Sequence, residues 1–170
     1  MKRDDFAIDF SSFRSDPRWR ANLYWHVSDR ISYMLWPKNG ASLKRALRIA
    51  PEGVRRFYLT GTVQGPVEDG GLGQYFARRR PTWLHEMAKQ EISNFDCHHV
   101  VTILEEAELY VRQNRASLRD VIKLDEWLKI MGVVAMNRAL NDINGRCLRA
   151  CSDLDDAKER YLRKHRELFQ

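Results

Sequence analysis

Apolar residues recur every three or four positions along most of this chain, and that spacing decides its fold class. Early in the chain the apolar positions are Trp19, Leu23, Val27, Ile31, Met34 and Leu35. Such spacing gives a helix one apolar stripe, whereas a half-buried strand would alternate strictly between apolar and polar residues. No segment alternates convincingly, so the sequence predicts an all-α protein of about seven to nine helices.

Proline, glycine and capping residues predict where these helices begin and end. Asp16-Pro17 is a typical helix start, and Pro81-Thr82 is expected to open a later helix. The segment 64–73 contains four glycines and a proline, so we expect a loop there. Asp96 is expected to cap a long helix that follows it, and Gly132 to break or kink another. Ser152 with Asp155 predicts the start of the last helix.

Length and composition fit one soluble domain. The 170 residues include 44% apolar residues, enough to bury a core in a single compact multi-helix domain, which we expect over 16–170. Residues 1–15 are expected to form an irregular N-terminal arm that docks through Phe6, Ile8, Phe10 and Phe13. We identify no signal peptide and no membrane-spanning stretch. The three cysteines, an odd number, favour a reducing cytoplasm over a disulfide framework.

The formal net charge of +6 invites a nucleic-acid partner, but the charge is unevenly spread. Both ends of the chain are basic, and residues 81–126 carry a balance of −4. The candidate phosphate contacts are clustered basic residues, two groups in the helices over 42–56 and one beside an aromatic pair: Lys44, Arg45, Arg48, Arg55, Arg56, Arg78, Arg79 and Arg80. The alternative is that these residues belong to a solvated surface and to helix ends.

Metal and catalytic chemistry have weak signals. Zinc takes about four Cys or His ligands, and the chain offers Cys97, His98, His99, Cys147 and Cys151. The two groups are far apart in sequence and complete no known spacing, so core cysteines are the favoured interpretation. No catalytic triad, dyad or cofactor motif is recognisable. We therefore expect no metal, no cofactor and no catalytic residue, although an enzyme with an unrecognised site stays an alternative.

The segment Glu68-Asp69-Gly70-Gly71-Leu72-Gly73-Gln74-Tyr75-Phe76 resembles the signature of the DNA-mimic-protein-like family. That signature is an Asn-Gly-Gly-aromatic-x-Gln-aromatic-aromatic run after a helix. The flanks are similar too: a helix over 54–62 precedes the segment, an acidic helix over 100–107 follows, and Leu154 to Phe169 is similar to the family's end. Asp69 replaces the family's Asn, and Leu72 replaces its aromatic residue.

The resemblance implies an all-α bacterial domain with no known catalytic role. Imitation of DNA needs dense carboxylates, and a chain of net charge +6 does not offer them globally. We expect the signature to form a structural loop, with Asp69, Gly70 and Gly71 shaping the turn. Gln74 would bond buried backbone groups, and Tyr75 and Phe76 would fix the loop to the core.

These observations predict a cytoplasmic, non-catalytic module that binds another protein, with a regulatory role and with homodimerisation left open. The alternative is a module that binds nucleic acid through the basic residues above. No membrane partner is expected.

Overall fold

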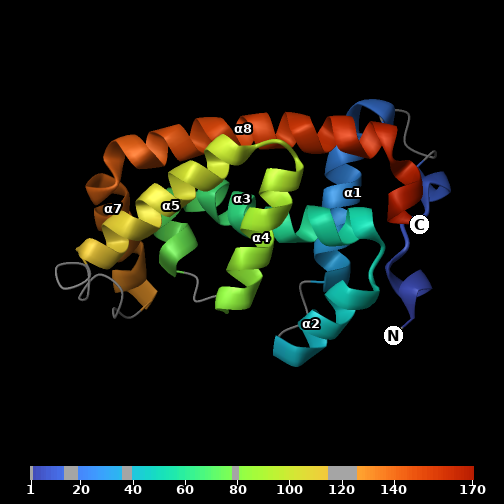
Figure 1. Cartoon of the computed structure of the whole chain (residues 1–170), viewed down its shortest axis with the longest axis horizontal. Coiled ribbons are helices and arrows are strands. Elements are labelled where there is room, and N and C mark those ends of the chain that lie inside the picture. The colour runs from blue at the N-terminus through green and yellow to red at the C-terminus, as the bar shows by residue number, and fades with distance from the viewer. Residues whose placement is uncertain (1, 14–18, 36–39, 78–80, 115–125) are drawn as a thin grey trace. The chain divides into compact units, whose positions relative to one another are not determined.

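A computed structural model of the chain describes residues 2–13, 19–35, 40–77, 81–114 and 126–170 (Figure 1). These residues form helices and no strand, which confirms the predicted all-α class. The 3-10 helices are η1 (Arg3–Phe6), η2 (Phe10–Phe13) and η3 (Arg166–Phe169). The α-helices of the described residues are α1 (Trp19–Leu35), α2 (Gly40–Ile49), α3 (Glu52–Ala77), α4 (Thr82–Asn94), α5 (His98–Gln113), α7 (Glu126–Ala139) and α8 (Asn141–Lys164).

The predicted loop over 64–73 is wrong, because α3 continues through most of it. Leu59, Val63 and Val67 recur at four-residue intervals on α3 and are almost fully buried. Burial of that stripe outweighs the weak helix propensity of the glycines and of Pro66. The helical backbone is interrupted only at Gly70 (φ −167°, ψ 23°) and Gly71 (φ 72°, ψ −172°). The signature is therefore a break between two helical stretches.

The helix start expected at Ser152 and a helix break at Gly132 are both wrong. α8 runs without interruption through Ser152, where a helix start was expected, and α7 runs through Gly132. Along α8 the buried residues Cys147, Ala150, Cys151 and Leu154 form one continuous helical stripe. A continuous stripe fixes one helix, so the capping pattern inside it has no structural effect.

The described chain divides into two compact units. One combines Met1–Gly61 with Ala157–Gln170, and the other is Thr62–Asp156. We call them the terminal unit and the central unit. The predicted extent of one domain over 16–170 stays a prediction.

The core of the terminal unit is built around Phe169, near the end of the chain. Its ring contacts Phe57 edge-on at a centroid distance of 5.0 Å and lies 6.3 Å from Phe10. The backbone N–H of Ile8 donates to the Phe169 carbonyl over 2.7 Å. Phe6 and Ile8 are both buried, so the predicted docking of the arm through these two residues is confirmed.

In the central unit, α4 and α5 pack against each other as neighbours (Figure 1). The turn between them was expected at Asn94 to Asp96, and it lies there. Asp96 adopts a left-handed conformation (φ 59°), and the N-cap residue of α5 is Cys97 rather than Asp96. No helix among the described residues is long and apolar enough to span a bilayer.

Candidate functional site

Two asparagines from α7 and α8 hold the break in α3. Asn137 accepts a hydrogen bond from the Gly73 N–H and donates one to the Gly70 carbonyl, each over 2.7 Å. Asn144 accepts from the Leu72 N–H, also over 2.7 Å. The backbone groups that the break leaves without helical partners are thus bonded by side chains of the same unit. This supports a structural role for the signature glycines.

At two positions of the break, Gly71 and Gly73, there is no space for any side chain. A Cβ on Gly71 would lie 2.6 Å from the Asn144 side-chain oxygen, and its backbone has a positive φ. A Cβ on Gly73 would lie 2.4 Å from the backbone oxygen of Val133 in α7. Close approach of α7 to α3, together with the turn, therefore accounts for these two glycines.

A buried glutamine that precedes the signature, Gln64, bonds a backbone carbonyl of another helix. The Gln64 amide donates to the Cys151 carbonyl on α8 over 3.1 Å, and its side chain is 3% exposed. Gln74 is half-buried beside Gly70. Sequence reasoning missed Gln64 because it treated that part of the chain as loop.

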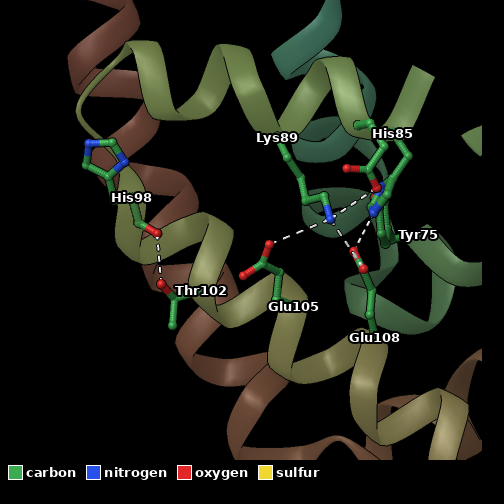
Figure 2. Close-up of polar contacts among 8 residues, drawn as sticks. Tyr75, His85, Lys89, His98, Thr102, Glu105 and Glu108 are labelled. Carbon is green, nitrogen blue, oxygen red and sulfur yellow. Dashed lines mark hydrogen bonds and ion pairs between the residues drawn. The ribbon is translucent and has the colours of Figure 1, made fainter. Parts of the chain in front are cut away.

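Tyr75 begins a polar network that links α3, α4 and α5 (Figure 2). Its hydroxyl hydrogen-bonds Nδ1 of His85, and Nε2 of His85 bonds the Glu108 carboxylate. Tyr75 is only 5% exposed, and Phe76 packs edge-on against its ring at 5.2 Å. Because its hydroxyl is buried and bonded, Tyr75 serves to fix the end of α3 to α4 and α5.

Lys89 joins the same network from α4. Its ammonium lies 3.4 Å from Glu108, 3.2 Å from Glu86 and 3.8 Å from Glu105. Burial alone would lower the pKa of Lys89, but the neighbouring carboxylates of Glu108 and Glu86 raise it above its ordinary value. Burial alone would raise the pKa of Glu108, but the bond and charge of His85, with Lys89, hold it below its ordinary value.

Replacing Glu108 with Gln is expected to lower the free energy of unfolding at pH 7 by about 1–3 kcal/mol, because a charge-assisted hydrogen bond is lost. The lowered pKa means that the Glu108 contribution is present above the unfolded-state pKa of about 4.3 and is lost as pH falls through the folded-state value. Urea unfolding at pH 7 and at successively lower pH values tests this. The variant should lose less stability than the wild type as the pH falls.

Glu105 on the same helix is the control for that prediction, because its side chain is 60% exposed. Glu105→Gln should change stability by less than about 1 kcal/mol. Equal acid sensitivity of wild type and Glu108→Gln would contradict the assignment.

The candidate phosphate contacts fall into three groups. Lys44, Arg45 and Arg48 are exposed together on α2. Arg55 and Arg56 are half-buried, and Arg56 is bound to Glu52 (2.6 Å) and lies over the Tyr161 ring. This second group therefore serves packing in part. Arg78, Arg79 and Arg80 lie outside the described residues.

Of the two aromatic residues that precede those last three arginines in the sequence, Tyr75 is not available for stacking. Tyr75 is buried, and Phe76 is half-buried against it. Two other aromatic residues, both on α1, are widely exposed: Trp25 (63%) and Tyr33 (75%). The sequence analysis did not single out these two residues. The available signal was their position outside the apolar stripe of α1.

The cysteines and histidines considered for zinc are dispersed. Cys97, Cys147 and Cys151 are free and buried, as the core interpretation predicted. His98 and His99 are exposed, and His99 contacts Asp153 over 3.1 Å. Over the described ranges, no group of three or more Cys, His, Asp or Glu side chains is arranged to hold a metal ion.

The two units differ in net charge more than successive segments of the sequence do. The terminal unit holds 17 Lys and Arg against 8 Asp and Glu, a balance of +9. The central unit holds 12 against 15, a balance of −3. The two basic ends of the sequence thus belong to one compact unit, and the signature lies in the acidic one.

Comparison with protein-family models, with curated proteins and with solved structures gives no match for this chain. The resemblance to the DNA-mimic-protein-like family stays a prediction.

Proposed function

We propose that this chain is a non-catalytic binding protein whose terminal unit binds the phosphate backbone of nucleic acid. The observation that carries the proposal is the balance of +9 on that unit. Nucleic acids attract clustered lysine and arginine because binding releases counterions from the phosphate array. A chain in which one unit is strongly basic and the other mildly acidic has the charge pattern expected when only one part contacts phosphate.

Helix α2 gives the terminal unit a defined basic face. Leu43, Ala46 and Leu47 are buried, which fixes the orientation of the helix. Lys44, Arg45 and Arg48 are exposed, and their spacing of one and three residues puts them within about 100° of the helix circumference. Three cations on one side of a fixed helix are well placed to contact neighbouring phosphates.

The test is binding of a fluorescent 20-bp duplex, measured by anisotropy over a series of salt concentrations. Replacing Lys44, Arg45 and Arg48 with Ala should weaken binding at low salt and reduce the slope of log K against log salt by about 2 to 3. Each phosphate contact contributes about 0.9 to that slope. Alanine is a good helix former, so α2 should stay folded.

The matched control replaces three exposed arginines of the central unit, Arg112, Arg138 and Arg149. It lowers the formal net charge of the chain from +6 to +3, as the α2 variant does. This control should bind the duplex nearly as well as the wild type. Equal losses in both variants would mean that total charge, and not α2, governs binding. Absence of duplex binding by the wild type at low salt would overturn the proposal.

A protein partner is the second candidate, and α5 of the central unit favours it. Glu105, Glu106 and Leu109 are exposed within about 100° on that helix, and Leu109 is 51% exposed. An apolar side chain between carboxylates suits a partner with a basic, partly apolar surface. Co-purification from lysate before and after nuclease treatment, with Leu109→Ala beside the wild type, tests it. A stoichiometric protein that survives nuclease and is lost in Leu109→Ala would support this candidate.

A further inference from the structure

The exposed side of α1 is unusual because two large aromatic residues occupy it. Trp25 and Tyr33 are 63% and 75% exposed, whereas Leu23, Val27, Ile31 and other apolar residues of the helix are buried. The buried residues show that α1 already has a complete core-facing stripe. Trp25 and Tyr33 are therefore surplus to the packing of the terminal unit.

Helix geometry places the two rings on one side. They are eight residues apart, which corresponds to about 12 Å along the axis and about 80° around it. Exposed Asp29 lies between them, so the face is not continuously apolar. Two aromatic rings with a polar residue between them are better suited to stack two separate planar groups than to bind one continuous apolar surface of a partner.

Trp25 is supported from within the unit. Its ring meets Tyr24 edge-on at 5.4 Å, and Tyr24 in turn contacts Phe57 at 5.9 Å. Lys158, almost fully buried, lies 5.2 Å from the centroid of the Tyr24 ring. The exposed indole thus rests on a side chain that the core holds in place, which limits the entropy lost when a ligand stacks on it.

The charge around this face decides which partner it fits. Both rings belong to the unit with a balance of +9. Helix α2, with its exposed Lys44, Arg45 and Arg48, follows the end of α1 after residues 36–39 (Figure 1). Aromatic platforms combined with basic residues are typical of surfaces that bind single strands, where bases stack and cations contact the backbone.

We propose that Trp25 and Tyr33 stack unpaired bases, so that the preferred ligand of the terminal unit is single-stranded nucleic acid. The inference rests on the proposed phosphate binding and adds the class of ligand. In a duplex the bases are already stacked on one another, so the rings should matter only for single strands.

The experiment measures anisotropy of fluorescein-labelled dT12 and of a 12-bp duplex with the full chain and its variants. Replacing both Trp25 and Tyr33 with Ala should weaken dT12 binding by about 10- to 100-fold, since stacking contributes substantially for each base. Duplex binding should change by less than about threefold. Replacing both residues with Phe keeps a ring at each place and should restore most of the dT12 affinity. Leu148→Ala, at an exposed apolar residue of the central unit, is the control and should leave both affinities unchanged.

The outcomes separate this inference from the proposed function. Binding that depends on Lys44, Arg45 and Arg48 but not on the two rings would overturn the stacking inference and leave phosphate binding intact. Failure of the wild type to bind either probe at low salt would overturn both. A concentration-dependent doubling of mass in sedimentation that the double Ala variant abolishes, with dT12 affinity unchanged, would mean that the face binds a second copy instead.

Discussion

Gly73→Ala is expected to lower the free energy of unfolding by about 3 kcal/mol or more. The added Cβ would lie 2.4 Å from the Val133 backbone oxygen and 2.9 Å from the Asn137 side-chain oxygen. A backbone oxygen in a helix cannot turn aside as a flexible side chain can, so α7 must shift. The shift would also strain the hydrogen bond that Gly73 donates to Asn137. Urea unfolding followed by far-UV circular dichroism measures the effect.

Gly61→Ala is the matched control, because Gly61 lies in the same helix and a Cβ there meets nothing within 4 Å. It should raise the free energy of unfolding by about 0.5–1 kcal/mol, the difference in helix propensity between the two residues. The two substitutions are chemically identical and should act in opposite directions. A Gly73→Ala variant as stable as the wild type would contradict the close approach of α7 to α3.

Phe169→Ala is expected to lower the free energy of unfolding by about 3–5 kcal/mol, although the residue is the penultimate one of the chain. Its side chain is fully buried, and its ring contacts Phe10, Phe57 and Tyr161. Removing the ring leaves a cavity in the core of the terminal unit. Thermal and urea unfolding of the variant beside Leu168→Ala, whose side chain is half-exposed, would measure the difference.

A double-mutant cycle between Gly53 and Phe169 tests the packing of the Phe169 ring directly. A Cβ on Gly53 would lie 2.5 Å from the Phe169 ring, so Gly53→Ala alone should destabilise the chain. In the Phe169→Ala background the same substitution should be neutral or stabilising, because the ring is gone and the new methyl group fills space. The same sign in both backgrounds would contradict the contact.

Much of the helical structure follows from the apolar periodicity. The expected start at Pro81-Thr82 and the turn near Asn94 were recognisable because a proline and turn-forming residues coincide with the edge of an apolar stripe. The errors arose where local signals and the stripe disagree. Gly65 and Pro66 suggest a loop, but buried Val63 and Val67 keep the segment helical.

The candidate site was harder to predict, because it depends on distant segments. The bonds from Asn137 and Asn144 to the glycine break span more than 60 positions of sequence. Nothing in the local spacing around His85 indicates that Tyr75 and Glu108 are its partners. Likewise, the full balance of +9 on the terminal unit is reached only when Ala157–Gln170, with a balance of +3, joins Met1–Gly61, with a balance of +6. The exposure of Trp25 and Tyr33 could be inferred from the apolar stripe of α1. That both residues belong to the unit with a balance of +9 could not be inferred from the sequence.

Binding of nucleic acid by the terminal unit is tested most directly by a map of where nucleic acid contacts the chain. A photoreactive dT15 bearing 4-thiothymidine would be cross-linked to the intact protein at low salt, and the cross-linked peptides identified by mass spectrometry. We expect cross-links in Met1–Gly61 and Ala157–Gln170, with peptides containing Trp25, Tyr33 or Lys44 among them. Cross-links confined to Thr62–Asp156, or none at a concentration that saturates other basic binding proteins, would contradict it.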